Sequence, residues 1–448
     1  MPDFRTRDGA AAHARRRHPS ASDQRLRELG AHAPRISPEL YEPIARERAR
    51  RAVRIGGIVL LVAVVIVGAG VQWFRPVPAP VYQPSLAGVL RLPGAPPSLP
   101  WPATGAAALA VAGAGSLGSV GSTKPVPVAG LAKVMTAYVV LKDHPLAVGA
   151  DGPSVPVSAD AVASSQAEQA AKEATVPLSA GETLTELQAL QGVMVASGND
   201  MAVLLADWDA GTTAAFLVKM NGAARALGMR STTFTDPSGL DAGTVSTPED
   251  LVTLASAAMA LPAFAAVVAL PQVSLPPNGT YYNLNYDVGR YGIVGIKTGA
   301  DDAAGGCFLF AARRSVAGQS VTLVGAVLGQ RATPETGAAV DAGAALVKAA
   351  FAAAGPMPLL RAGTSVGQIV APWGPSVPVT VAASSPVVAW PGLLVPVRTK
   401  MGPLARSLPA GTAVGTLVVS FGTERTSLVL RTAQTLSGPS AFWRLTRF

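Results

Sequence analysis

The most pronounced pattern along the chain is an uncharged apolar run of 20 residues from Ile55 to Phe74. As a helix it would span about 30 Å, the thickness of a bilayer's hydrocarbon core. Arginines crowd its N-terminal side, and Trp73 and Phe74 stand at its other end. This asymmetry predicts a single-pass transmembrane helix in the cell membrane, with a cytoplasmic N-terminus and an extracytoplasmic body beyond Arg75. A cleaved signal peptide is disfavoured, because its apolar region is usually only about 7–15 residues long.

The segments that flank this run have few regular patterns. Residues 1–54 are rich in Arg, Ala and Pro without apolar periodicity, which predicts a mostly disordered cytoplasmic tail. Residues 75–104 contain many prolines, as in "LPGAPPSLPWP", and predict an extended, semi-rigid linker. Short Val/Leu strands between Gly and Pro turns predict a small β domain over residues 356–431, followed by a C-terminal tail over residues 432–448.

The body, residues 105–355, changes its periodicity along its length. Small apolar residues after Gly105 predict a strand and hairpin. Apolar residues with helical spacing then predict helices over 131–141, 185–196, 200–208 and 246–260, and Thr247 is the predicted N-cap of the last of these. After Gly292, "GIVGIKT", "GCFLFAARR" and "VTLVGAVLG" predict three consecutive antiparallel strands, and a last helix is expected over 333–354. Helices around an antiparallel sheet make the body an α+β domain.

Charge and composition exclude several classes of function. The formal net charge is +9, but residues 1–54 hold 13 Arg and 7 acidic residues and so carry about two thirds of it. The body therefore lacks a basic face for nucleic acid, and none is expected as a partner. Cys307 is the only cysteine, so no internal disulfide can form, and the four histidines lack ligand spacing. We expect no metal and no cofactor.

Three short motifs carry the candidate chemistry, although each alone is weak. Lys133 opens a helix in "KVMTAYVVL", the triplet SGN lies at 197–199, and the triplet KTG lies at 297–299 at the end of a strand. With S-x-x-K and S-D-N, K-T-G forms the signature of penicillin-binding proteins and class A β-lactamases. The order and setting of the motifs make the combination more specific than its parts.

These motifs, with "GETLTELQAL", "TFTDPSGLD" and "GIKTGADDAAGGCFL", resemble the serine-type D-alanyl-D-alanine carboxypeptidases, the low-molecular-mass penicillin-binding proteins. The resemblance covers about residues 105–355 and implies a β-lactamase/DD-peptidase-like fold that acts on peptidoglycan stem peptides ending in D-Ala-D-Ala. It implies that Lys133 is the base, that Ser197 relays a proton and that Asn199 holds the lysine. Lys297, Thr298 and Gly299 would bind the substrate's terminal carboxylate, and β-lactams would be held at the same place.

One residue departs from the family pattern. The nucleophilic serine should lie three residues before Lys133, where this chain has Gly130, and Ser116, Ser119 and Ser122 are out of register. Loss of such a nucleophile costs on the order of 10⁶-fold in rate. We therefore expect a catalytically impaired enzyme or a pseudoenzyme that binds stem peptides, and binds β-lactams non-covalently. Three alternatives remain open. The protein could be a hydrolase with an unconventional nucleophile, or an active serine enzyme whose serine at position 130 was engineered or misread as glycine. It could also be a module that only contacts the wall or other proteins.

Overall fold

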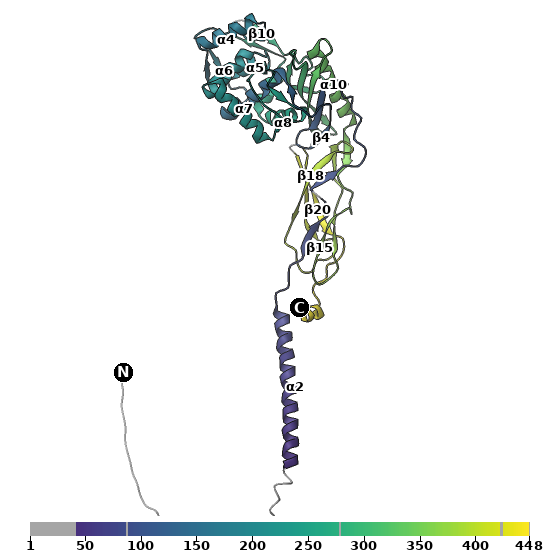
Figure 1. Cartoon of the computed structure of the whole chain (residues 1–448). Helices are drawn as coiled ribbons and strands as arrows, with labels where there is room; N and C mark the ends of the chain where they lie inside the picture. Colours follow the sequence, from purple (N-terminus) through teal and green to yellow (C-terminus); the bar gives the residue numbers. More distant parts are fainter. Residues whose placement is uncertain (1–41, 87, 277–278, 422–423, 448) are drawn as a thin grey trace, which may run out of the picture. The chain divides into compact units, whose positions relative to one another are not determined.

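The computed structural model describes residues 42–86, 88–276, 279–421 and 424–447 (Figure 1). The chain divides into two compact units, of which one is Pro78–Pro439 and the other joins the segments on either side of it. Each unit is considered by itself below.

The smaller unit is built on one long helix, α2 (Glu42–Phe74). Its apolar side chains are exposed along the whole run, as Ile55 and Val65 illustrate. Arg46–Phe74 is long and apolar enough to cross a membrane. The helix starts earlier than the apolar run, so residues 42–54 are helical rather than part of the expected irregular tail. Residues 1–41 of that tail lie outside the described residues.

A short helix at the other end of the chain, α11 (Ala441–Thr446), packs on the end of α2. The Arg447 guanidinium donates hydrogen bonds to the backbone carbonyls of Gln72, Arg75 and Pro76, and the Gln72 amide donates to the Arg447 carbonyl at 2.8 Å. A cation at the C-terminal end of a helix satisfies carbonyls that have no partner within the helix. The C-terminal tail therefore carries an ordered contact that its sequence pattern did not predict.

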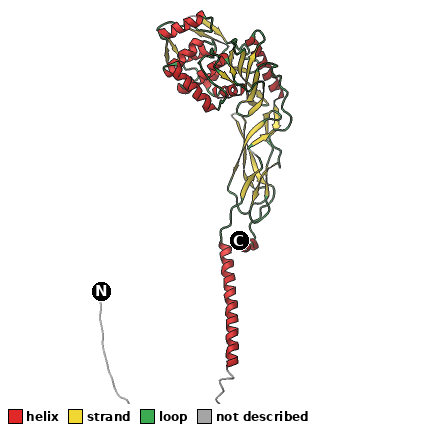
Figure 2. Cartoon of the chain, in the orientation of Figure 1, coloured by secondary structure: helices red, strands yellow, loops and turns green. Residues whose placement is uncertain are grey.

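The larger unit contains the predicted antiparallel sheet (Figure 2). Its five strands follow the order β11-β12-β13-β3-β4, and every neighbouring pair is antiparallel. Their bounds are β3 (Ala106–Val111), β4 (Gly115–Val120), β11 (Ile293–Gly299), β12 (Gly306–Val316) and β13 (Gln319–Gln330). The hairpin near Gly105 and the three-strand meander are both confirmed.

Helices cover this sheet, which confirms the α+β class. α8 (Pro248–Ala258) and α10 (Glu335–Ala353) pack on its strands. Thr247 caps α8 by accepting from the Asp250 amide, as the sequence predicts. α10 is also apolar enough to span a membrane, but it packs on β12 and β13 and buries residues such as Val340 and Phe351. The remaining helices are α3 (Ala132–Asp143), α4 (Ala159–Ala170), α5 (Glu186–Met194), α6 (Asn199–Ala210), α7 (Thr213–Leu227) and α9 (Pro262–Val268).

Another part of the unit is a seven-stranded sheet with the order β1-β15-β16-β20-β19-β18-β2, and the described residues also form four two-stranded sheets. Five of its strands lie where the small β domain was predicted: β15 (Ser365–Val370), β16 (Val377–Val381), β18 (Leu394–Met401), β19 (Ala413–Phe421) and β20 (Glu424–Thr432). The other two, β1 (Val81–Pro84) and β2 (Val89–Arg91), come from the proline-rich segment. That segment is therefore partly strand, since it pairs with β15 and β18 instead of remaining a free spacer.

Candidate active site

The position expected to hold the nucleophile lies in a single 3-10 turn, η3 (Ala129–Leu131), that leads directly into α3. η3 packs against β11. A Cβ atom placed on Gly130 would lie 3.4 Å from the Thr298 carbonyl oxygen and 3.6 Å from Lys133 Nζ. These are ordinary contact distances. The backbone therefore has room for a side chain at position 130, directed at the lysine that a serine would need.

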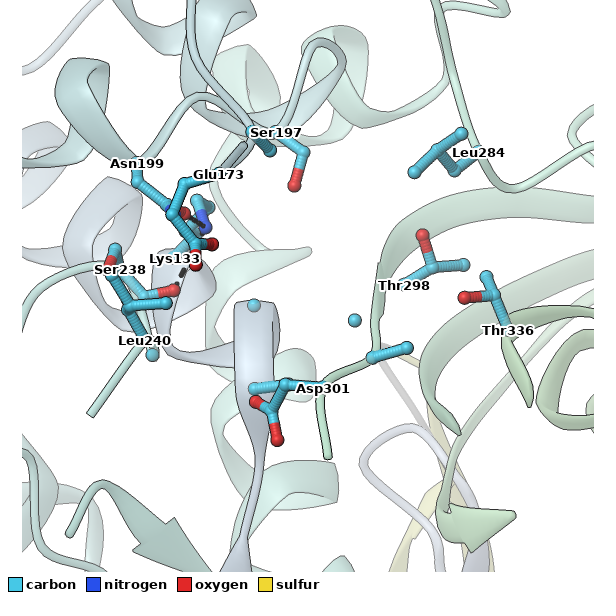
Figure 3. A pocket seen from close by; sticks show the side chains of 16 residues that line it. Lys133, Glu173, Ser197, Asn199, Ser238, Leu240, Leu284, Thr298, Asp301 and Thr336 are labelled. Carbon is cyan, nitrogen blue, oxygen red and sulfur yellow. Dashed lines mark hydrogen bonds between the residues drawn. The ribbon is translucent and has the colours of Figure 1, made fainter. Parts of the chain in front are cut away.

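Lys133, on the first turn of α3, is 2% exposed. Its Nζ donates hydrogen bonds to Asn199 Oδ1 at 2.6 Å and to the Ser238 carbonyl oxygen at 2.9 Å (Figure 3). Burial lowers the pKa of Lys133 to about 8, against the opposing effect of nearby carboxylates, of which Asp236 has the largest influence. A buried lysine with a pKa near neutrality is suited to act as a base or a nucleophile.

The SGN triplet lies in the turn between α5 and α6. Ser197 has a left-handed backbone conformation, with φ of 64°, and Asn199 begins α6. The tight turn directs both side chains toward the two lysines, because Ser197 Oγ accepts from Lys297 Nζ at 2.9 Å while Asn199 accepts from Lys133. The structure thus brings together Lys133, Ser197, Asn199 and Lys297, as the sequence predicts.

The site has two walls. Lys133 on α3 and the SGN turn form the first, and β11 forms the second. Lys297 is 2% exposed and donates to Ser197 Oγ and to the Thr298 carbonyl oxygen, each at 2.9 Å. Burial, followed by the charge of Lys133, lowers its pKa well below the usual value for lysine. The Thr298 hydroxyl is buried and has no hydrogen-bond partner among the described residues. An unsatisfied buried hydroxyl costs free energy, and a bound ligand oxygen would satisfy it.

Gly299 is where the two walls approach each other most closely. A Cβ atom there would lie 2.6 Å from the Gly130 amide nitrogen and 3.1 Å from Ala129 Cβ. The first distance is too short for any real side chain, so only glycine allows β11 to lie this close to η3. Gly299 therefore contributes through the absence of a side chain.

A cleft of about 170 Å³ is lined by Gly130, Lys133, Ser197, Asn199, Thr298 and Gly299 (Figure 3). Lys297 is not one of its lining residues, and it contacts the lining through Ser197 and Thr298. Ser197, Asn199 and Lys133 lie on one side and Thr298 on the other, with Asp301 at a third edge. Gly130 and Ala300 also line the cleft, and an oxyanion hole would use a backbone N–H group at each of these two positions.

Sequence reasoning did not identify three contributors to the site. Ser238 accepts from Lys133 through its backbone carbonyl, and Asp236 shapes that turn by accepting from the amides of Ser238, Gly239 and Leu240. The signal was present in "DPSG", because an aspartate that bonds backbone amides further along the chain is typical of a turn. Glu173, which lines the cleft beside Lys133, had no such signal.

Behind Lys133 lies a group of carboxylates. Asp200 accepts from the Ser165 hydroxyl and from the Val176 amide, and burial raises its pKa. Burial and the charge of Asp200 raise the pKa of Glu168 to about 7. These acids favour the charged form of Lys133 and so partly offset its desolvation.

The family comparisons agree with this geometry. A family model of D-alanyl-D-alanine carboxypeptidases matches residues 113–331. The D-alanyl-D-alanine carboxypeptidase of Streptomyces sp. strain K15 is 34% identical over 219 residues, which are 45% of this chain and 72% of that protein. The chain belongs to this family. D-alanyl-D-alanine carboxypeptidase DacB2 of Mycobacterium tuberculosis is 42% identical over 141 residues, but that match spans only 48% of the mycobacterial protein and 30% of this chain.

Solved structures support the fold of the family. The Streptomyces K15 DD-transpeptidase aligns with a TM-score of 0.50 and 29% identity, covering 57% of this chain and 99% of that one. Penicillin-binding protein 5 of Haemophilus influenzae aligns over 77% of this chain and all of its own, with a TM-score of 0.54 and 20% identity. The DD-peptidase-like fold is thus established for this chain.

Proposed function

We propose that this protein is a membrane-anchored, extracytoplasmic member of its family that binds peptidoglycan stem peptides ending in D-Ala-D-Ala without cleaving them. The observation that carries the proposal is the environment of Gly130. Its Cβ position lies 3.6 Å from Lys133 Nζ, so the backbone has room for a nucleophile beside the lysine and only the side chain is missing. Acyl transfer of the serine type needs an oxygen at this place.

The binding half of the cleft supports the same conclusion. Lys297 offers a buried amine, and the Thr298 hydroxyl is buried without a partner among the described residues. A ligand carboxylate would receive hydrogen bonds from both, and hydrogen bonds to charged groups contribute about 1.5–3 kcal/mol each. β-Lactams carry a comparable carboxylate and would compete for the cleft.

The membrane part of the proposal rests on α2. Its exposed apolar side chains are not covered by any described residue of the chain, and Trp73 and Arg75 stand at the end opposite the arginine-rich segment. This distribution favours a cytoplasmic N-terminus. A protease added to intact spheroplasts should cleave beyond Arg75. Protection of the whole body would contradict the orientation.

The test of the catalytic part compares the natural chain with Gly130→Ser and Gly130→Ala. The natural chain should release no D-Ala from a D-Ala-D-Ala pentapeptide, while it binds the peptide reversibly. Gly130→Ser should gain D-Ala release and a hydroxylamine-labile penicillin ester at position 130. Gly130→Ala adds the Cβ without the hydroxyl and should gain neither. D-Ala release by the natural chain at the rate of Gly130→Ser would refute the proposal.

A second candidate, a hydrolase with an unconventional nucleophile, is favoured by one contact. Ser197 Oγ lies 2.9 Å from Lys297 Nζ, and burial lowers the pKa of that lysine well below the usual value. A neutral lysine could activate this hydroxyl. Ser197→Ala would abolish any D-Ala release that depends on it, and a penicillin ester mapped to Ser197 would establish this candidate.

A further inference from the structure

We propose that Lys133 is itself a nucleophile toward strained acyl donors, so that a penicillin bound in the cleft acylates the Lys133 amine and leaves a stable amide. The protein would then capture one β-lactam per chain. This inference rests on the proposed function, because it requires a cleft that binds the ligand carboxylate and lacks the serine hydroxyl.

The position of the amine is the first support. Lys133 Nζ is fixed by its hydrogen bonds to Asn199 at 2.6 Å and to the Ser238 carbonyl at 2.9 Å. In the neutral form these bonds use both hydrogens of the amine. Because Lys133 also lines the cleft, its lone pair is left to face the space where a ligand lies.

The second support is the space beside Gly130. In a serine enzyme the hydroxyl stands between the lysine and the ligand carbonyl. Here the nearest atoms to the Cβ position are the Thr298 carbonyl at 3.4 Å, Lys133 Nζ at 3.6 Å and Gly299 Cα at 3.7 Å. A carbonyl carbon can therefore move past the missing side chain toward Nζ. Of these three atoms, Lys133 Nζ is the one that can act as a nucleophile.

Charge supports the same reaction. Burial lowers the pKa of Lys133 to about 8, so an appreciable fraction is neutral near that pH. Desolvation is one of the features that activate lysine nucleophiles, and it is the cause that lowers the pKa of Lys133. The carboxylates of Asp236, Glu168, Asp200 and Glu173 oppose this effect, which makes the reaction slower than with an isolated buried lysine.

The step balances without a further reactant. The amine lone pair attacks the β-lactam carbonyl carbon and forms a C–N bond, while the developing oxyanion is met by the N–H groups of Gly130 and Ala300. The ring C–N bond breaks, and the ring nitrogen takes up the proton that Lys133 loses. Relief of ring strain drives this exchange. The amide bond of a D-Ala-D-Ala peptide is unstrained, so its replacement by an amide to Lys133 releases no strain energy. Peptides therefore remain uncleaved.

The experiment uses the full-length chain in nanodiscs with fluorescent penicillin and follows intact mass. We expect one penicilloyl group per chain, mapped to Lys133 and resistant to hydroxylamine. The rate should rise about tenfold from pH 6 to pH 7, following the neutral fraction of the amine, and level off above the pKa of Lys133. Lys133→Arg should lose the label, whereas Lys142→Arg, an exposed lysine of the same helix, should keep it.

Gly130→Ala provides a test that does not remove the lysine. The added Cβ would stand between the carbonyl and the amine, so labelling should slow by at least about tenfold while reversible binding persists. Equal labelling of natural chain and Lys133→Arg, equal labelling of denatured protein, or an ester at Ser197 would each refute the inference. Reversible binding without any adduct would also refute it, yet would leave the proposed function intact. D-Ala release from a peptide would instead refute the proposed function.

Discussion

The two walls of the cleft each carry a buried lysine, and the lysines are held in nearly the same way. Lys133 donates to a side-chain oxygen of the SGN triplet and to a backbone carbonyl, and so does Lys297. Beside Lys297 stands the Thr298 hydroxyl, whereas beside Lys133 stands Gly130 with no side chain. The comparison teaches that the two lysines are held by separate elements, and that the backbone around Gly130 keeps its place beside Lys133 without a side chain.

The strongest test of this separation restores the nucleophile and then removes its base. In a Gly130→Ser background, Lys133→Ala should reduce penicillin acylation by about 10²–10⁴-fold, the usual contribution of general-base catalysis. Reversible binding of the peptide should change little. Stopped-flow acylation and calorimetry measure the two effects. Unchanged acylation would mean that Lys133 is not the base that its geometry indicates.

The matching change on the other wall is Lys297→Ala. Loss of a hydrogen bond to the charged carboxylate should weaken binding of a D-Ala-D-Ala peptide by about 10–100-fold. Lys142→Ala, on the exposed surface of α3, is the control and should bind like the natural chain. If Lys297→Ala bound equally well in calorimetry, the assignment of β11 as the carboxylate wall would be wrong.

Gly299→Ala tests whether the walls must lie close together. Its Cβ would stand 2.6 Å from the Gly130 amide nitrogen, so β11 or η3 must shift. We expect a destabilisation of about 1–3 kcal/mol in thermal unfolding, as for other overpacked sites, and weaker peptide binding. Gly130→Ala meets its nearest atom at 3.4 Å and should retain the stability of the natural chain.

Thr298→Val isolates a single hydroxyl. This hydroxyl has no partner among the described residues, so its replacement should leave the melting temperature unchanged or raise it. Peptide affinity should fall by about 2–10-fold, the net value of one hydrogen bond. A loss of stability with unchanged affinity would show that the hydroxyl serves the fold and not the ligand.

Glu186→Gln should have the smallest effect on peptide binding, because Glu186 belongs to neither wall of the cleft. It tests instead how a buried carboxylate affects stability. Both carboxylate oxygens of Glu186 lack partners among the described residues, and burial raises its pKa to about 7. Between about pH 4.5 and 7 the folded chain holds a proton that the unfolded chain releases, so stability falls as the pH rises. Above pH 7 the variant should be more stable than the natural chain, because its side chain carries no buried charge, and peptide affinity should be unchanged. An identical pH profile of thermal unfolding for both proteins would contradict this account.

Local sequence signals predicted much of the fold. The apolar run, the Thr247 cap and the alternating strands after Gly292 each depend on neighbours within a few residues, and the structure has α2, α8 and the β11–β13 meander there. Strands β1 and β2 were missed, because they are short and gain their hydrogen bonds from partners about 300 residues away. The polar, alanine-rich helix α4 and the helix α7 were also not predicted.

The sequence by itself determined which residue types form the site, since the spacing of Gly130 from Lys133 and the SGN and KTG triplets can be read along the chain. Only the tertiary structure decided what each residue meets. The Ser238 carbonyl reaches Lys133 across 105 positions, and Ser197 reaches Lys297 across 100. The downward shifts in the pKa of the two lysines also arise in the folded state alone, because desolvation and the charge of a distant neighbour exist only once α3, α6 and β11 have packed together.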